Sequence, residues 1–204
     1  MRVSRQAFDT HHAAILDAAG RLFRSRGVAA VSLGEVSREA GLTHGAFYGH
    51  YPSKTALVEA SCRAAFARGA EAWRCRAEAA RAGGGSGLEA IVSAYLSEAH
   101  RDAPDQGCAL AALGQELARG DPATRRALGE GVAELELTLA DEVGMSRPDL
   151  TPEACERIAR GMLSAMAGGL MLSRCLTDLQ KSTEALLAAR AAAHAALVAT
   201  DLGD

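Results

Sequence analysis

The placement of proline is the feature that most restricts the fold of this chain. Its five prolines stand at positions 52, 104, 122, 148 and 152, and the long stretches between them contain none. Alanine, the best helix former, accounts for 45 of the 204 residues, whereas the aromatic residues that strands favour number eight. Because proline is tolerated at helix ends and not in helix interiors, this pattern predicts an all-α chain with its prolines at helix boundaries.

Apolar residues at helical spacing, separated by capping residues, predict about nine helices. Gly27 is suited to end the first helix, and Thr43 to be the N-cap of the third. Ser32 and Glu35 stand three residues apart and can satisfy each other's backbone donors in a capping box, and Gly41 is suited to end the second helix. The Gly-Gly-Gly-Ser-Gly stretch at 83–87 is the clearest loop. The expected helices are about 9–27, 32–40, 44–50, a long helix after Pro52-Ser53, and then about 88–100, 106–119, 122–144, 152–177 and 182–200.

Charge is unevenly distributed along the chain, whose formal net charge is −3. Residues 1–54 carry seven basic and four acidic side chains, and the remainder carries 15 basic and 21 acidic ones. Four of the six histidines also lie in the first part. A basic head on an acidic body suggests that only the head meets a polyanion, although a segment of this charge is also compatible with an ordinary solvated face.

Several classes of protein are disfavoured by features that the sequence lacks. The longest apolar run, Ala165–Leu172, falls far short of the ~18 residues of a membrane span, and the N-terminus lacks the apolar region of a signal peptide. We therefore expect a cytoplasmic protein without a membrane partner. The five cysteines form no Cys-x-x-Cys pair, and no zinc-type cluster is found, so neither a disulfide framework nor a metal site is expected.

An enzyme is also not expected, and no cofactor is predicted. The glycine-rich stretch at 83–87 is not followed by Lys-Ser or Lys-Thr, so it is not a phosphate-binding loop. His100, Arg101 and Asp102 are adjacent in sequence, and on a helix they would point away from one another. No pair of carboxylates and no nucleophile with a neighbouring base is apparent.

The spacing between residues 32 and 51 predicts a helix-turn-helix. Val36, Ala40, Leu42 and Phe47 would face inward, and Gly41 would allow the positive φ of the turn. Small residues on the outer face of the second helix would let its backbone approach groove edges and phosphates. The simpler alternative is a corner between two helices whose Tyr and His side chains are ordinary surface residues.

These residues belong to a longer pattern. The turn is preceded by the run Ile15-Leu-Asp-Ala-Ala-Gly-Arg-Leu-Phe23. It is contained in the run Gly41-Leu-Thr-His-Gly-Ala-Phe-Tyr-Gly-His-Tyr-Pro-Ser-Lys54. Residues from about 9 to 69 thereby resemble the DNA-binding domain of the TetR family of bacterial transcriptional regulators. The resemblance implies a three-helix DNA-binding domain at 9–69, with its helix-turn-helix at 32–51, and a helical ligand-binding and dimerisation domain at 70–204.

The resemblance also implies which residues would contact double-stranded DNA. His44, Gly45 and Ala46 would lie closest to the base edges, and the other positions would hold the phosphate backbone. Base preference stays open because His44 stands where the family often has Lys, Arg or Pro. The implied DNA-binding residues are Ser32, Thr43, His44, Gly45, Ala46, Tyr48, His50, Tyr51 and Lys54, with Arg5 as an additional phosphate contact.

Members of the family are homodimers that pair through their last two helices, which implies a palindromic operator for this chain. Here those helices are expected near 152–177 and 182–200. Gly161, Ala165 and Gly169 form a stripe of small residues that fits this pairing. The same stripe is also compatible with a tight crossing of two helices within one chain.

The remaining helices would enclose a site for an unidentified small-molecule inducer that releases the repressor from DNA. Candidate lining residues are Phe66, Trp73, Tyr95, Cys108, Met162 and Met166. The run Gly107-Cys108-x-x-x-x-Leu113-x-x-Glu116 resembles a subgroup in which some members sense electrophiles or oxidants through a cysteine at this place. A helix N-terminus can lower a thiol pKa, so Cys108 is a second candidate sensor, although free cysteines are usually small buried hydrophobes. A helical interaction protein that does not bind DNA is the remaining alternative.

Overall fold

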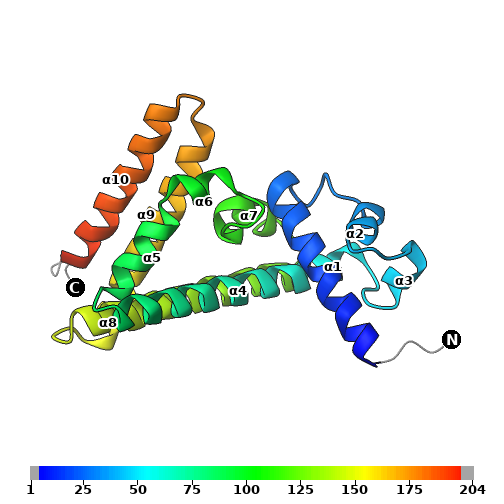
Figure 1. Cartoon of the computed structure of the whole chain (residues 1–204), viewed down its shortest axis with the longest axis horizontal. Coiled ribbons are helices and arrows are strands. Elements are labelled where there is room, and N and C mark those ends of the chain that lie inside the picture. Colours follow the sequence, from blue (N-terminus) through cyan, green and yellow to red (C-terminus); the bar gives the residue numbers. More distant parts are fainter. Residues whose placement is uncertain (1–4, 199–204) are drawn as a thin grey trace. The chain divides into compact units, whose positions relative to one another are not determined.

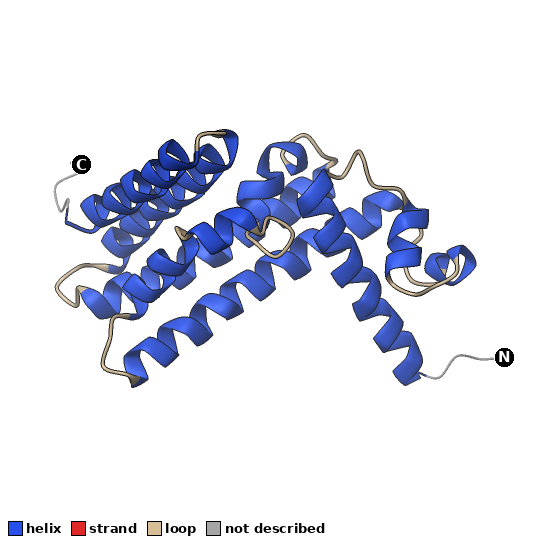
Figure 2. Ribbon diagram, turned by 45° about the horizontal axis from the view of Figure 1, so that its top comes forward, coloured by secondary structure: helices blue, strands red, loops and turns tan. Residues whose placement is uncertain are grey.

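A computed structural model of the chain describes residues 5–198, which contain ten α-helices and no strand (Figures 1 and 2). The prediction of an all-α fold is confirmed. The helices are α1 (Arg5–Arg26), α2 (Leu33–Glu39), α3 (His44–Tyr48), α4 (Lys54–Ala82), α5 (Gly87–Tyr95), α6 (Glu98–Asp102), α7 (Ala109–Leu117), α8 (Pro122–Ser146), α9 (Pro152–Cys175) and α10 (Leu179–Val198). None of these helices is both long and apolar enough to cross a membrane.

The helices form two compact units that do not correspond to a single cut in the chain. The first unit comprises Met1–Phe66 and Pro104–Gly131, and the second comprises Ala67–Ala103 and Val132–Asp204. Helices α4 and α8 each contribute residues to both units, and α7 belongs to the unit that contains α1 to α3. The functional division at residues 69 and 70 stays a prediction.

The predicted capping residues end and begin helices of the first unit. Gly27 follows α1 with a φ of 82°, and Gly41 follows the C-cap of α2 with a φ of 70°. Ser32 forms the capping box of α2, since its Oγ accepts from the Glu35 N–H at 3.2 Å while Glu35 Oε2 accepts from the Ser32 N–H at 2.8 Å. Thr43 is the N-cap of α3, as expected.

The first unit has an apolar core in which α1 contacts both α2 and α7. Ile15 and Phe23 of α1 are buried in it, together with Val36 of α2 and Phe47 of α3. The inward-facing prediction is therefore confirmed for Val36 and Phe47. It is wrong in degree for Ala40 and Leu42, which are only half-buried because they lie at the turn, where the chain leaves α2.

The prediction of a single helix at 88–100 is wrong, because this segment forms the two helices α5 and α6. The backbone leaves the helical conformation at Leu96 and is extended at Ser97, whose Oγ accepts from the His100 N–H at 3.2 Å. Ser97 is thus an N-cap that starts a new helix, and this extra break raises the number of helices from about nine to ten. The expected helix at 106–119 also begins later, at Ala109, with Cys108 as its N-cap.

Helices α9 and α10 lie side by side in the second unit (Figures 1 and 2). A methyl group added at Gly169 would overlap the Ala189 side chain, and one added at Gly161 would lie 3.6 Å from Ala196 Cβ. The small residues therefore allow close approach of two helices of the same chain. The stripe thus serves a tight crossing within one chain, and its fit to a dimer stays a prediction.

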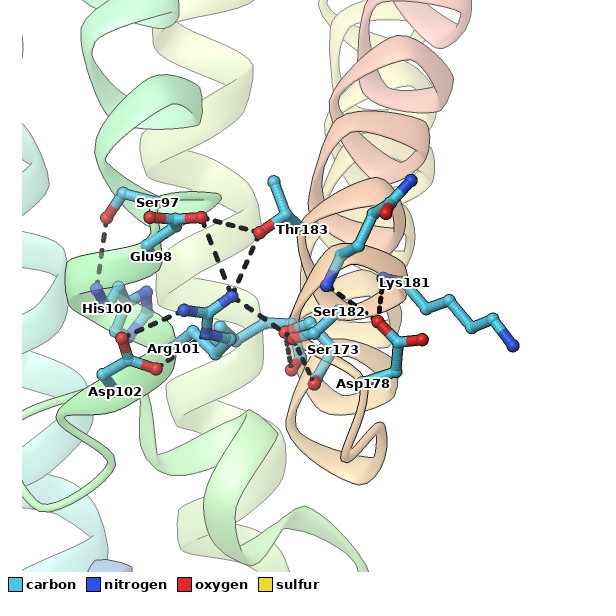
Figure 3. Close-up of polar contacts among 12 residues, drawn as sticks. Ser97, Glu98, His100, Arg101, Asp102, Ser173, Asp178, Lys181, Ser182 and Thr183 are labelled. Atoms are coloured by element: carbon cyan, nitrogen blue, oxygen red, sulfur yellow. Dashed lines mark hydrogen bonds and ion pairs between the residues drawn. The ribbon is translucent and has the colours of Figure 1, made fainter.

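A polar cluster joins α6 to the start of α10 (Figure 3). The Arg101 side chain is only 9% exposed and lies 3.3 Å from both Ser182 Oγ and Thr183 Oγ1. It also forms an ion pair with Asp102, with Nε 2.7 Å from Oδ1. The expectation that Arg101 and Asp102 point apart is wrong, because the long guanidinium arm folds back to its neighbour at the C-terminal end of a five-residue helix.

Candidate nucleic-acid interface

The short helix α3 presents a polar cap and small residues to solvent. Thr43 Oγ1 accepts from the Ala46 N–H at 3.3 Å, which fixes the first turn of the helix. Thr43, Gly45 and Ala46 are exposed, and Tyr48 at the end of the helix is 51% exposed. A methyl group at Gly45 would meet nothing within 4 Å. Packing within the first unit therefore does not require a glycine at position 45. A glycine that the fold does not need is expected where a partner approaches the backbone closely.

Three other predicted positions surround this helix. The backbone of His44 starts α3, while its side chain lies outside the part of the chain that the structure describes. Ser32 is exposed, and its hydroxyl is used in the capping box of α2. Arg5 is exposed at the first turn of α1.

The predicted phosphate contacts Tyr51 and His50 differ from Tyr48 in their surroundings. Tyr51 is only 5% exposed, and its hydroxyl lies 3.0 Å from His12 Nε2 on α1. Burial raises the pKa of Tyr51 to about 12, so its phenol stays protonated. Tyr51 thus joins α1 to the segment after α3, whereas His50 is half-buried and Tyr48 is exposed.

The charges near α2 are largely paired within the first unit. Arg21 forms ion pairs with Asp17 and Glu39, and Arg26 bonds to Glu35 at 2.9 Å. The pKa of Glu35 is lowered to about 2, chiefly by the Ser32 backbone N–H, then by the Ser32 hydroxyl and by Arg26. Lys54, half-buried at the start of α4, is the basic residue that directly follows the α3 surface in the sequence.

A clamp between α7 and the turn after α1 was not predicted from the sequence. The two carboxylate oxygens of Glu116 accept from the N–H groups of Val28 and Ala29, at 2.9 and 2.8 Å. Arg24 of α1 donates to the Asp105 carbonyl, with its Nε at 2.8 Å. The sequence pattern that contains Cys108 ends with this glutamate. The pattern therefore pointed to Glu116 but did not reveal that its carboxylate binds the turn after α1.

The six candidate ligand-lining residues do not fall within one unit. Phe66 and Cys108 belong to the first unit, and the Phe66 ring packs against Gly131. The other four belong to the second unit, where they are buried. Among them Trp73 and Tyr95 are in contact, edge to face, with ring centroids 5.7 Å apart. Trp73, Tyr95, Met162 and Met166 thus share one unit, to which Phe66 and Cys108 do not belong.

The five cysteines differ in exposure. Cys108 is half-buried, Cys75 and Cys175 are exposed, and Cys62 and Cys155 are buried. Burial raises the pKa of the Cys62 thiol to about 11, and a hydrogen bond to Glu71 raises that of Cys75. Within residues 5–198 no group of three or more His, Cys, Asp or Glu side chains is arranged to hold a metal ion.

The exposed short helix α3 after a capped turn has the arrangement of a helix-turn-helix, the element with which one class of transcriptional regulators binds DNA. Comparison with known families supports this class over most of the chain. Residues 15–61 match the family described as "Bacterial regulatory proteins, tetR family", and residues 84–189 match "Tetracyclin repressor-like, C-terminal domain". The chain belongs to the TetR family of transcriptional regulators.

Individual relatives agree with this assignment. The HTH-type transcriptional regulator AcrR of Shigella flexneri is 51% identical over 43 residues, which are 21% of this chain and 20% of AcrR. The chain therefore matches only a fifth of the length of that relative. A TetR-family regulator from Cytophaga hutchinsonii has a similar fold, with a TM-score of 0.74 at 19% identity over 96% of this chain and 98% of the other. The reduced form of E. coli NemR gives a TM-score of 0.71 at 20% identity, over 91% and 95% of the two chains.

Proposed function

We propose that this protein is a cytoplasmic repressor that binds a palindromic operator as a homodimer and is released by a small-molecule inducer. The observation that carries the proposal is the exposed surface formed by Thr43, Gly45, Ala46 and Tyr48, followed by Lys54. Backbone N–H groups and a hydroxyl at a helix start suit phosphate oxygens, and a phenol and an ammonium group add further contacts. Thr43, Tyr48, His50 and Lys54 hold the backbone in this proposal, with Ser32 and Arg5 as additional phosphate contacts.

Residues 44–46 then lie nearest to the base edges. Gly45 and Ala46 supply little hydrogen bonding, so sequence preference depends on His44, on DNA shape and on operator spacing. Tyr51 supports this surface from inside through its bond to His12.

The test is a fluorescence-anisotropy titration with DNA that flanks the gene for this protein. Tyr48→Phe and Lys54→Ala are expected to weaken binding, and Lys54→Ala also to lower the dependence of affinity on salt by about one counterion per chain. The chain contains one other lysine, Lys181, which is exposed on α10 of the second unit, so Lys181→Ala is a matched control that should bind like wild type. Binding that is absent at every salt concentration would overturn the proposal and leave a helical interaction protein.

The inducer is proposed to bind within the second unit beside the Trp73–Tyr95 pair, near Met162 and Met166. These side chains are buried, and they would give the inducer a mainly apolar lining with a single aromatic pair. Quenching or shift of the fluorescence of Trp73, the single tryptophan of the chain, would report occupation of this site. A compound that releases DNA without changing Trp73 emission would place the inducer elsewhere.

A second candidate function is sensing of electrophiles or oxidants by Cys108. It is favoured by the position of Cys108 at the N-cap of α7 within the first unit, and by the likeness to NemR, whose structure is described as a reduced form. Alkylation followed by intact-mass analysis should then modify Cys108 before the exposed Cys75, and Cys108→Ser should keep DNA binding that thiol reagents no longer abolish. Equal or slower reaction at Cys108 would remove this candidate.

A further inference from the structure

Three imidazole rings gather in the first unit, where the N-terminal half of α1 meets the segment that follows α3. The His50 ring stacks on Phe8 with centroids 4.2 Å apart, and it lies 6.1 Å from the His11 ring and 6.0 Å from the His12 ring. The His12 ring in turn stacks on Tyr51 at 5.0 Å and bonds to its hydroxyl. We refer to His11, His12 and His50 as the imidazole cluster.

The cluster holds two buried ring nitrogens that lack a partner. Nδ1 of His12 and Nδ1 of His50 have no hydrogen-bond partner among the described residues. A buried polar atom without a partner costs free energy, so such an arrangement persists only where the surrounding packing imposes it or where the unpaired atom has a role. Neither nitrogen is paired in the described part of the free protein, so a proton added there gains no hydrogen bond within the first unit.

The charge on the cluster is limited by its own geometry. The pKa of His50 lies below its ordinary value of 6.5, first because the ring is buried and then because His12 and His11 add positive charge when protonated. Asp9 on α1 and Lys54 at the start of α4 are the neighbouring charged residues in the sequence, and within residues 5–198 no ion pair joins either of them to the three rings. The phenol of Tyr51 stays neutral. A positive charge on His50 is therefore unfavourable in the free protein.

We propose that the imidazole cluster is a proton-linked phosphate site: it takes up a proton when the phosphate backbone of DNA docks on the first unit, so that DNA affinity rises as pH falls. This proposal rests on the proposed function. In the sequence His50 lies between Tyr48 and Lys54, the two phosphate contacts of that function, so DNA held by both would bring its phosphates toward the cluster. Burial and the neighbouring rings make a positive charge on His50 costly in the free protein. A nearby phosphate offsets this cost.

The direction and size of the effect follow from linkage. Where the bound complex holds one more proton per chain than the free protein, affinity rises by up to about tenfold per chain for each pH unit lost. The window lies between the pKa of His50 in the free protein, which is below its ordinary value of 6.5, and its higher pKa in the complex with DNA. Mutual repulsion of rings about 6 Å apart limits the uptake to about one proton per chain.

The test is anisotropy at constant ionic strength, from about pH 7.5 to about pH 5.5, with a fluorescein-labelled duplex of the DNA that flanks the gene. Wild type is expected to bind more tightly as pH falls, and His50→Gln and His12→Gln to lose most of that slope. His194→Gln is the matched control, because His194 lies on α10 of the second unit beside Glu89, and it should keep the full slope. Far-UV circular dichroism of each variant checks that it is folded.

Calorimetry of wild type provides a second measurement that needs no variant. Binding heats in buffers of different ionisation enthalpy give the number of protons taken up, which is expected to be close to one per chain near pH 6.5. Tight binding with no proton uptake, or an equal slope in wild type and His50→Gln, would overturn the inference and leave the proposed function intact. Absence of DNA binding at every pH would instead overturn the proposed function, and this inference with it.

Discussion

The carboxylate of Glu116 on α7 bonds to the backbone N–H of Val28, 88 residues earlier in the chain, at 2.9 Å, and to that of Ala29 at 2.8 Å. The turn after α1 is thereby held by a helix from a distant part of the sequence. Gly27, which opens this turn, has a φ of 82°, and a methyl group there would lie 3.1 Å from Glu116 Oε2. The carboxylate of Glu116 therefore packs closely against Gly27 while it binds the two N–H groups that follow.

The first prediction is that Glu116→Ala loosens this turn. Two backbone donors lose a charged acceptor, and we expect the free energy of unfolding of the first unit to fall by about 1–3 kcal/mol. Hydrogen exchange at the Val28 and Ala29 amides should accelerate. Gln115→Ala, on the exposed neighbouring position, is the control and should change neither quantity. Unchanged exchange at both amides in Glu116→Ala would show that the clamp does not hold the turn in solution.

The second prediction concerns two glycines of α8 that stand two residues apart. A methyl group at Gly131 would overlap the Phe66 ring, whereas one at exposed Gly129 would meet nothing within 4 Å. Gly131→Ala is therefore expected to destabilise by about 1–3 kcal/mol through overpacking. Gly129→Ala should stabilise by up to about 1 kcal/mol, because alanine is the better helix former. Urea unfolding of both variants is the measurement, and equal signs for the two would contradict the packing at Phe66.

The local features of the DNA-binding segment could be predicted because capping depends on residues three or four positions apart. Ser32, Thr43 and the positive-φ glycines at 27 and 41 lie where the sequence places them. The break between α5 and α6 was missed although Ser97 is a good N-cap residue, since the apolar positions of 88–96 continue smoothly toward it.

Features that depend on contacts between distant residues could not be predicted from one sequence. Glu116 reaches residues 87 and 88 positions away, and Tyr51 reaches His12 across 39 positions. The same limit explains the candidate site. Tyr48 and Tyr51 differ by three positions in one motif, and only the packing of α1 on the segment after α3 makes one exposed and the other buried.

The third prediction tests the proposed pairing of α9 and α10 with a second copy of the chain. Leu172 on α9 and Leu187 on α10 are 53% and 60% exposed, so both helices of the proposed interface present apolar side chains to solvent. Leu187→Glu would place a charge against its own copy across a two-fold interface, so we expect the dimer dissociation constant to rise at least about tenfold. Sedimentation equilibrium measures this constant. Leu137→Glu, at an equally exposed position of α8, is the control, and a dimer that weakens equally in both variants would place the interface elsewhere.

The fourth prediction is that the second unit loses stability as pH falls, through His100. Its ring donates from Nδ1 to the Tyr95 carbonyl at 2.7 Å and meets the Tyr95 ring edge to face. The pKa of His100 is lowered, first by burial and then by the charges of Arg174 and Arg76, against the opposing effect of the Tyr95 carbonyl. Neutral His100 therefore stabilises the folded state fully above its unfolded pKa of about 6.5, and this contribution is lost as pH falls through the lower folded pKa.

Urea unfolding followed by Trp73 fluorescence reports this unit, because Trp73 packs against Tyr95. Between about pH 7 and about pH 5 the free energy of unfolding should fall with a slope of up to about 1.4 kcal/mol per pH unit, and His100→Gln should reduce that slope. His194→Gln is the control, since His194 is the other histidine of the second unit and its Nε2 lies 3.1 Å from a carboxylate oxygen of Glu89. A slope that is the same in wild type and His100→Gln would mean that His100 is not the group whose protonation weakens the second unit.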